Sequence, residues 1–502
     1  MTSELGVPVQ TGAAPAASLE DRRRLDLSLA RGIAWTGAMK WLAQLLSWVS
    51  TIVIARLLSR EDVGIYALAT LYMGFVQLVS EFGLGSAIVQ RRDLSPRQIA
   101  ELGGLSVALG VGLWALSVVA AWPVAAFFEA PPLRWIIAAM GATFVTSGLK
   151  VLPRALLSRD LRFKQVASLE AAETLFVTAA TLSLALLGFR YWALALGGIL
   201  GALGGTALAI RWRPHPLAWP ASFDGIRSAV TFGGHLVGSR IAWYGYSNAD
   251  FAIVGRVLGT AALGVYQIGW SIATIPVQRV SALVGQVIPA ILSSVQHDRA
   301  ALRRYFLLLT EGLALVTFPF SVGLCLVAED AVLVLLGAKW APAIVPLQLL
   351  AAYAGVRSVT VLFSHFLVAA NRTRASMHFS LLALGVLPPL FWLGTRWGPE
   401  GVAAAWIVGY PLVALPAYRM VTELTGTSSR AYLAAMMPAA GAAATMAVAV
   451  LGVHHALPEA LPRAIRLALD VAVGVLVYGG VILALRRERV RLLVALVRDR
   501  RR

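Results

Sequence analysis

Long apolar runs separated by short polar gaps occupy almost the whole chain, and no gap could hold a folded soluble domain. A helix needs about 20 apolar residues to cross a hydrocarbon core of about 30 Å. The chain is therefore expected to be an all-α polytopic membrane protein with about 14 transmembrane helices. The expected spans are 33–56, 63–89, 99–122, 133–153, 166–188, 191–210, 228–254, 262–290, 304–327, 343–370, 376–394, 400–420, 431–452 and 465–485.

Composition argues against a soluble globular protein and against a nucleic-acid-binding protein. Of the 502 residues, 58% are hydrophobic and only 14% are charged, more apolar surface than a soluble fold of this size can bury. The net charge of +18 falls mostly between the apolar runs, with no basic face carrying aromatic platforms, so nucleic acid is not an expected partner. The single cysteine, Cys325, sits in an apolar run and is expected to be a packing residue.

One stretch occurs twice, with an offset of 200 residues and no gap. Residues 40–66 read KWLAQLLSWVSTIVIARLLSREDVGIY, and residues 240–266 read RIAWYGYSNADFAIVGRVLGTAALGVY. Both contain the pattern R-x-L-x5-G-x-Y, and both begin with a cation. The identical pairs are Ser47 and Ser247, Arg56 and Arg256, Leu58 and Leu258, Gly64 and Gly264, and Tyr66 and Tyr266.

This repeat predicts two pseudo-symmetric six-helix lobes followed by two C-terminal helices. Each half holds an even number of spans, so both halves run in the same direction, related by an axis along the membrane normal. The expected divisions are a basic tail (1–30), an N-lobe (31–212), a Pro-rich linker (213–227), a C-lobe (228–422), spans 13 and 14 (431–486) and a second basic tail (487–502).

Arginine and lysine placement predicts the orientation. The loops after even-numbered spans are the more basic, as are both tails, so both termini are expected to be cytoplasmic. The sparsely charged loops, expected to face the other side, carry Arg60, Arg134, Arg190, Arg256, Lys339, Arg396 and Arg463.

Ionisable residues deep in the spans indicate function or internal pairing, because each costs at least a few kcal/mol at membrane depth unless it faces protein or water. They are Lys40, Glu81, Glu170, Glu173, Arg240, Asp250, Arg279, Glu311 and Arg357. Internal ion pairs, such as Glu81 with Lys40, are one explanation. A proton or sodium ion bound by Glu81, Asp250 or Glu311 is the other.

Lys40 and Arg240 are expected to face each other across the pseudo-axis, because they occupy equivalent positions in the repeat. Two facing cations repel, and an anion between them removes the repulsion. Pyrophosphate fits, since arginine binds it through two parallel hydrogen bonds and lysine as a point charge. Arg279 lies at comparable depth and is a third candidate for this site.

Spans one and seven also carry polar and aromatic side chains that a lipid-facing helix does not need. They predict a hydrated groove that contacts sugar, although interfacial aromatic belts and helix packing also use such residues. The cavity-lining candidates are Trp41, Gln44, Ser47, Trp243, Tyr244, Ser247 and Asn248.

No catalytic motif or metal-ligand pattern appears, so the chain is not expected to be an enzyme and no metal or cofactor is expected. His454 and His455 are expected in a solvated outer loop without partners. The glycines between Gly197 and Gly205 are expected to allow close helix packing.

At this point the sequence resembles the polysaccharide transporter branch of the multidrug/oligosaccharidyl-lipid/polysaccharide exporter superfamily, and within it the Wzx-type lipid-linked oligosaccharide flippases. The resemblance is carried by ARLLSREDVGIY at residues 55–66, by EFGLGSA at 81–87, and by the unit from Asp250-Phe251 through Gly259 to Tyr266. It extends over about residues 30–420.

The resemblance implies two six-helix lobes in a V and alternating access in the bacterial inner membrane. It implies an undecaprenyl-pyrophosphate-linked oligosaccharide as substrate, for exopolysaccharide, capsule or O-antigen (lipopolysaccharide) synthesis. Proton or sodium coupling is common in the superfamily, and a polysaccharide polymerase and a chain-length regulator are expected partners besides membrane lipids. A cation-coupled multidrug antiporter and a membrane-bound polymerase or glycosyltransferase are the alternatives.

Overall fold

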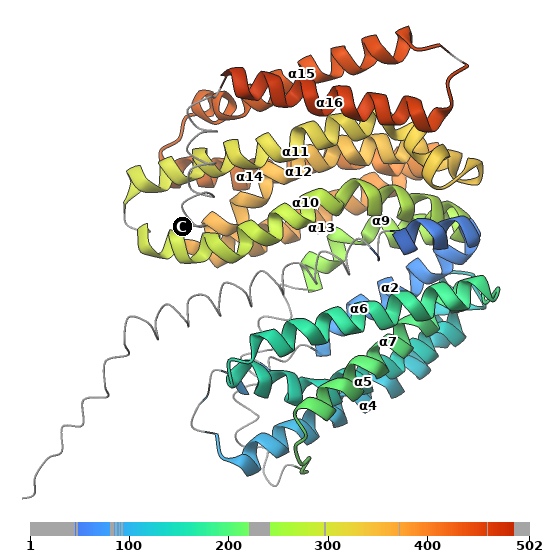
Figure 1. Ribbon diagram of the computed structural model, residues 1–502. Helices are drawn as coiled ribbons and strands as arrows, with labels where there is room; N and C mark the ends of the chain where they lie inside the picture. Colours follow the sequence, from blue (N-terminus) through green and yellow to red (C-terminus); the bar gives the residue numbers. More distant parts are fainter. Residues whose placement is uncertain are drawn as a thin grey trace, which may run out of the picture.

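The computed structural model is nearly all-helical over the residues that it describes, which are 46, 49–80, 85, 88–89, 91, 94–219, 241–295, 298–370, 372–458 and 460–485. Figure 1 shows the helices stacked side by side in two groups. They are α2 (Arg60–Ser80), α4 (Pro96–Phe127), α5 (Leu133–Arg159), α6 (Phe163–Leu186), α7 (Tyr191–Trp212), α9 (Ala249–Ile253), η1 (Val254–Leu258), α10 (Gly259–Val295), α11 (Arg299–Leu335), η2 (Ala338–Ala343), α12 (Ile344–Ala369), α13 (Thr373–Gly394), η3 (Thr395–Trp397), α14 (Gly398–Thr425), α15 (Ser429–Ala456) and α16 (Arg463–Leu485).

The described residues contain ten segments that are long and apolar enough to cross a membrane, which makes the chain a multi-pass membrane protein. The all-α prediction is confirmed. The number of 14 spans stays a prediction, because much of the first and seventh expected spans lies outside the described residues.

Several helices extend beyond the expected spans because their ends are capped outside the apolar runs. The helix expected over 99–122 begins at Pro96, where Ser95 and Gln98 form a reciprocal capping box. The boundary expected near Pro153 is wrong, since α5 continues to Arg159. A proline removes only one intrahelical hydrogen bond, and the neighbouring turns continue the helix.

Glycines let the helices of the first group approach closely. A Cβ on Gly110 of α4 would lie 2.4 Å from the carbonyl oxygen of Phe144, and one on Gly148 of α5 would lie 2.4 Å from that of Ser106. On α7, a Cβ on Gly197 would lie 1.9 Å from Thr181 Oγ1 of α6, and one on Gly201 would lie 2.1 Å from Val177 Cγ2. The packing role expected for this glycine run is confirmed.

Contacts between helices join α4–α7 into one set and α9–α14 into another, with α2 packed between them against α5 and α10. We call α2 with α4–α7 the N-group and α9–α14 the C-group. The α15–α16 pair packs on α11 at the outer side of the C-group (Figure 1). The main helix contact between the two groups is that of α2 with α10. These two helices begin at equivalent points of the sequence repeat.

At their crossing, the repeated glycines meet reciprocally. A Cβ on Gly64 would lie 1.8 Å from the carbonyl oxygen of Thr260, and a Cβ on Gly264 would lie 2.0 Å from that of Arg60. Because Arg60 and Thr260 are also 200 residues apart, the same contact is made twice with the roles exchanged. Such an exchange is the signature of a two-fold axis running through the interface.

Side chains from both groups tie the chain together at the same end of the crossing, which we call the closed end. Arg56 donates through Nε to the carbonyl oxygen of Leu335 at 2.7 Å, and Arg60 Nε donates to that of Lys339 at 2.6 Å. Lys339 Nζ in turn donates to the carbonyl oxygens of Arg56 and Leu58, each at 2.7 Å.

The repeated arginines make equivalent contacts in opposite directions. Arg56, in the first repeat, reaches the end of α11 in the C-group. Arg256, in the second, forms an ion pair with Glu129, which follows α4 in the N-group. Span three and span nine are equivalent in the predicted duplication, so this exchange follows the same two-fold relation as the glycines.

Replacing either crossing glycine with alanine is expected to lower the unfolding temperature of the purified protein. The added methyl group overlaps backbone atoms, which cannot rotate away as a side chain can. The loss of folding free energy should therefore lie at the upper end of the range typical of overpacking, about 3 kcal/mol. Gly64→Ala and Gly264→Ala should cause similar losses, and the double variant should lose less than their sum because both separate the same two helices.

The matched control is Gly112→Ala on α4, where an added Cβ meets nothing within 4 Å. Unfolding temperatures of Gly64→Ala and Gly264→Ala equal to that of the control would show that the helices do not meet through these glycines.

Candidate functional site

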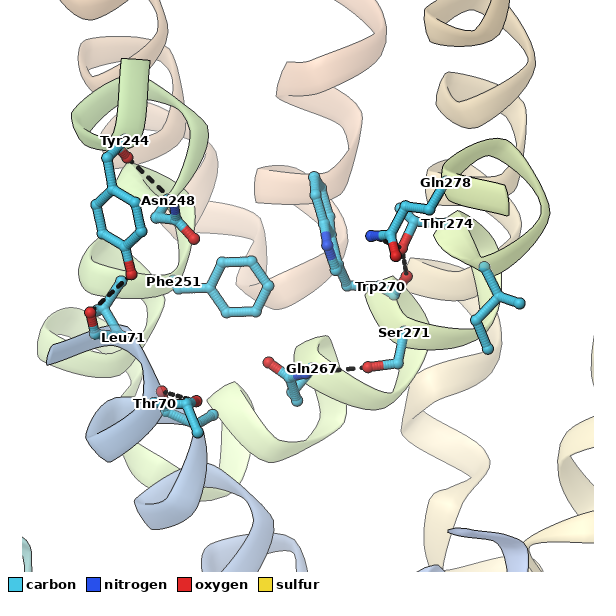
Figure 2. Close-up of a pocket in the computed structure, with 12 residues that line it drawn as sticks. Thr70, Leu71, Tyr244, Asn248, Phe251, Gln267, Trp270, Ser271, Thr274 and Gln278 are labelled. Atoms are coloured by element: carbon cyan, nitrogen blue, oxygen red, sulfur yellow. Dashed lines mark hydrogen bonds between the residues drawn. The ribbon is translucent and has the colours of Figure 1, made fainter. Parts of the chain in front are cut away.

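A cavity of about 330 Å³ lies between the two groups, directly inside the closed end. Its wall comes from α2, from residues 244–251 and from α10, as Figure 2 shows. The lining residues are Ala67, Thr70, Leu71, Tyr244, Asn248, Phe251, Gln267, Trp270, Ser271, Thr274, Ile275 and Gln278. None of them is charged.

The cavity lies on the pseudo-two-fold axis. Three of its lining positions on α2, Ala67, Thr70 and Leu71, are each exactly one repeat away from lining positions on α10, namely Gln267, Trp270 and Ser271. Ala67 follows Gly64 by three residues, so the cavity begins about 5 Å inside the glycine crossing. Equivalent faces of α2 and α10 therefore enclose the cavity, but most of its polar side chains belong to the second repeat and α10.

A stripe of neutral polar side chains runs along α10 into this cavity. Gln267 donates to Ser271 Oγ at 3.0 Å, and Gln278 donates to Thr274 Oγ1 at 3.3 Å. The amide oxygens of both glutamines make no hydrogen bond to any described residue, so they can accept one from a ligand. The sequence interpretation missed this stripe, although its spacing of four, three and four residues marks one helix face.

Two of the candidates for sugar contact, Tyr244 and Asn248, line the cavity. Tyr244 donates to the carbonyl oxygen of Leu71 at 2.7 Å, which joins the C-group segment to α2. Asn248 donates to Ser247 Oγ at 3.1 Å. Ser247 and the exposed Trp243 are described but are not part of the wall.

Asp250 is fully buried behind the cavity wall, next to the lining residue Phe251. Its Oδ2 accepts hydrogen bonds from Tyr266 at 2.7 Å and from Trp406 Nε1 at 2.9 Å. Its Oδ1 makes no hydrogen bond to a described residue. Trp270 links this carboxylate to the cavity, because it lines the cavity and packs on both Tyr266 and Trp406.

The other deep ionisable residues have different environments. The pairing alternative holds for Glu173, which accepts from Lys150 at 2.7 Å, and for Glu170, which pairs with Arg154 at 2.7 Å. Glu311 is buried on α11, and Arg357 is half-buried on α12.

The remaining candidates cannot be placed. Lys40, Trp41, Gln44, Ser47, Glu81 and Arg240 lie outside the described residues, as does the side chain of Arg279 on α10.

The expectation of a solvated loop for the two adjacent histidines is wrong. His454 and His455 end the helix α15, and His454 Nδ1 lies 2.8 Å from Asp470 Oδ2 of α16. Sequence distance hid this partner, since the two helices form an antiparallel pair that brings residues 16 positions apart together.

Comparison with known proteins places the chain in a family. The family described as "Polysaccharide biosynthesis protein" matches residues 53–345, which is more than half of the chain. The match includes both copies of the R-x-L-x5-G-x-Y pattern, at residues 56–66 and 256–266.

Two curated relatives align over most of their length. The succinoglycan biosynthesis transport protein ExoT of Rhizobium meliloti is 27% identical over 498 residues, covering 94% of this chain and 96% of the relative. The lipopolysaccharide biosynthesis protein WzxC of Escherichia coli is 24% identical, covering 80% of this chain and 82% of the relative.

Solved structures share the fold. A lipid II flippase, MurJ, in an inward closed conformation superposes with a TM-score of 0.71 at 12% identity, covering 91% of this chain and all of that chain. An inward-facing multidrug resistance transporter of the MATE family gives a TM-score of 0.63 at 14% identity, covering 77% and 96%. At such identities the likeness concerns the fold alone.

The relative ExoT is named as a transport protein and aligns with 94% of this chain, which supports a membrane transport protein and not an enzyme. The match over residues 53–345 agrees with the resemblance to polysaccharide transporters noted in the sequence, and the chain belongs to the polysaccharide biosynthesis protein family.

Proposed function

We propose that this protein moves an undecaprenyl-pyrophosphate-linked oligosaccharide from the cytoplasmic to the periplasmic leaflet of the bacterial inner membrane by alternating access. The product supplies exopolysaccharide, capsule or O-antigen synthesis. The proposal includes 14 spans in two six-helix lobes, with both termini cytoplasmic. One observation carries it: a neutral polar cavity lies on the axis of a duplicated helix bundle and is covered at one end by contacts between the two halves.

The orientation rests on the loops that form the closed end. Arg60, Arg256 and Lys339, which make its contacts, all belong to the sparsely charged loops assigned to the periplasm. The state described here then has its cavity shut off from the periplasm. Opening the other way requires the two halves to separate at the α2–α10 crossing.

The chemistry of the cavity favours sugar. Amide and hydroxyl groups both donate and accept hydrogen bonds, as sugar hydroxyls require, and Trp270 and Phe251 supply flat apolar surface. At about 330 Å³, the volume is at the lower limit of small-ligand sites, which span about 300–1,000 Å³. It therefore accommodates a fragment of the oligosaccharide, with the remainder outside this space.

For the pyrophosphate, the proposed partners are Lys40 and Arg240, with Arg279 as a third cation. Arg240 precedes the cavity residue Tyr244 by four positions in the sequence, on the cytoplasmic side in the expected orientation. The repeat assigns Lys40 the equivalent position, and Gln44 and Ser47 positions matching Tyr244 and Ser247. In this arrangement the charged group stays nearer the cytoplasm while sugar enters the cavity.

Asp250 is the proposed site of proton or sodium coupling, ahead of Glu81 and Glu311. A carboxylate without exposure is costly as a bare charge, so binding a proton or cation changes the free energy of this packing. Trp270 lines the cavity and packs against Trp406, which donates a hydrogen bond to Asp250. A change in packing around Asp250 can therefore move the cavity wall.

A cation-coupled drug antiporter is the weaker alternative. A cavity for cationic drugs needs acidic side chains, and none is among the lining residues that the structure describes. A polysaccharide polymerase and a chain-length regulator are proposed partners, because a flipped repeat unit must be joined to others.

Removing either proposed pyrophosphate ligand should abolish export. Loss of one partner from a desolvated charge pair costs about 2–5 kcal/mol, or at least tenfold in affinity. Lys40→Ala and Arg240→Ala should each prevent polysaccharide export in a strain that depends on this gene, with normal amounts of protein in the membrane. Lys40→Arg and Arg240→Lys should keep part of the activity, and glutamate at either position should be worse than alanine.

Arg303→Ala is the matched control, because Arg303 is an exposed cation on α11 away from the cavity. Gln267→Ala and Gln278→Ala, assayed in parallel, should reduce export without abolishing it. Wild-type export from the double variant Lys40→Ala/Arg240→Ala would contradict the proposal.

Neutralising Asp250 should separate binding from transport. Asp250→Asn keeps the size and the hydrogen-bond acceptor of the side chain, so the protein should still fold and bind a lipid-linked oligosaccharide with an affinity within about threefold of wild type. Its transport into proteoliposomes should lose any dependence on an imposed proton or sodium gradient. An unchanged response to both gradients would remove Asp250 from the coupling step.

A further inference from the structure

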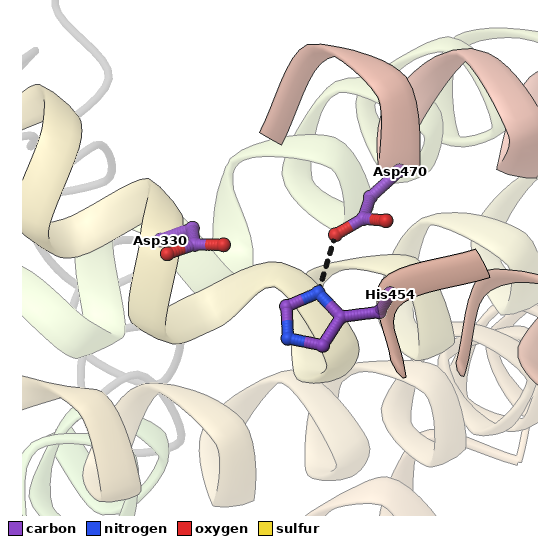
Figure 3. Close-up of side chains that lie close together, drawn as sticks. All are labelled: Asp330, His454 and Asp470. Carbon is purple, nitrogen blue, oxygen red and sulfur yellow. Dashed lines mark hydrogen bonds and ion pairs between the residues drawn. The ribbon is translucent and has the colours of Figure 1, made fainter. Parts of the chain in front are cut away.

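Three potential metal-ligating side chains meet at the closed end, away from the transport cavity. Asp330 lies near the end of α11, His454 near the end of α15 and Asp470 in the second turn of α16 (Figure 3). One donor atom from each can be chosen so that all three lie within 4.8 Å of one another. The three helices thus bring two carboxylates and one imidazole to a single point.

The carboxylates are buried deeply for residues near helix ends. Asp470 is 2% exposed and Asp330 is 6% exposed. Asp470 Oδ2 is bonded to His454, but Asp470 Oδ1 is also buried and makes no hydrogen bond to any described residue. An unsatisfied buried carboxylate oxygen costs at least about 1–3 kcal/mol, so it indicates a missing partner.

The position on α16 makes this burial more informative. Asp470 and Gly474 are the only residues described as buried on this helix, which otherwise exposes apolar side chains such as Val475 and Leu476. A helix of this kind faces lipid and gains nothing from a carboxylate as such. The acid is instead placed on the one face that contacts α11 and α15.

The surrounding charges leave room for a cation. Arg463 Nη1 lies 3.9 Å from Asp330 Oδ1 but closer, at 3.3 Å, to Glu329 Oε1, so it is shared between two acids. His455 Nδ1 contacts the carbonyl oxygen of Leu451, so this neighbouring histidine is engaged on its own helix.

We infer that Asp330, His454 and Asp470 bind a divalent transition-metal ion, with Zn²⁺ as the best match. Zn²⁺ accepts both imidazole nitrogen and carboxylate oxygen as ligands, and a site with three protein ligands keeps water in the fourth position. Ca²⁺ and Mg²⁺ prefer oxygen ligands alone and more of them. With zinc–ligand bonds of about 2.0–2.2 Å, the ligand atoms around a tetrahedral Zn²⁺ lie roughly 3.4 Å apart. Side-chain rotations that move the donor atoms by about 1 Å bring the three residues to this spacing.

The site joins the C-terminal helix pair to the C-group. Besides helix packing, α16 is tied to α11 at one end by the hydrogen bond from Tyr478 to the carbonyl oxygen of Leu315, at 2.7 Å, and at the other by the ion pairs of Arg463 with Glu329 and Asp330. A metal bound by one residue from each of α11, α15 and α16 strengthens the second of these links and adds α15 to it. The His454 side chain is 37% exposed, so the site is not sealed by protein on this side.

The test uses the purified full-length protein, stripped with a chelator and dialysed against ZnCl₂, with bound zinc measured by mass spectrometry. The wild type should bind about one Zn²⁺ per chain and show a higher unfolding temperature with the metal. His454→Ala and Asp470→Asn should weaken Zn²⁺ binding at least tenfold. His454→Cys should retain it, because a thiolate replaces the imidazole as a ligand.

His455→Ala is the matched control, since this neighbouring histidine contacts its own helix and should bind as the wild type does. If Asp470→Asn fails to fold, the comparison of His454→Ala with His454→Cys decides the matter. No zinc above background in the wild type, or equal binding by His454→Ala, overturns the inference. So does an unfolding temperature that follows pH but not Zn²⁺, which would identify a protonated His454 held between two carboxylates.

Discussion

The backbone contact between α2 and α10 determines the arrangement of everything around it. Two helices can approach this closely only where neither carries a side chain, and Gly64 and Gly264 meet that condition at the same point of the repeat. The contact positions both copies of the cavity-lining face, which begins one turn further along each helix. It also covers the cavity at one end, so the same two residues set the architecture and close the path.

The interactions at the closed end suit a contact that opens in the proposed transport cycle. Arg56, Arg60 and Lys339 donate to main-chain carbonyl oxygens of the opposite group. Bonds from charged donors contribute about 1.5–3 kcal/mol each, because water competes for both partners. Their sum is within the range that substrate binding can offset, provided that the substrate prefers the opposite state.

The sequence allowed the fold class, most helices and the family to be predicted, because apolar length and the exact 200-residue repeat are strong signals. The repeat also marked Arg56, Arg256, Gly64 and Gly264, although only the structure explains them as reciprocal contacts across an axis. Tyr244, Asn248 and Asp250 were found because polar residues are conspicuous in an apolar span.

The remaining features depend on tertiary contacts that no local pattern contains. The four polar residues of α10 are neutral and widely spaced, so they were not distinguished from ordinary packing until their common face was seen lining a cavity. His454 looked solvated because its partner, Asp470, comes from the next helix in the chain. The continuation of α5 past Pro153 shows that a proline inside a membrane helix is a weak boundary signal.

Paired distance measurements by electron paramagnetic resonance test the central claim, which is that the two halves alternate between this state and one in which they separate at the α2–α10 crossing. In a variant whose single cysteine, Cys325, is replaced by serine, one spin-label pair is placed at Leu187 and Trp397, and a second at Lys164 and Arg372. All four side chains are exposed, and the two pairs lie at opposite ends of the expected spans. When a lipid-linked oligosaccharide and an ion gradient are applied to the labelled protein in proteoliposomes, the distance between Leu187 and Trp397 should lengthen. The distance between Lys164 and Arg372 should shorten. Two distances that stay constant, or that change in the same direction, would contradict the account.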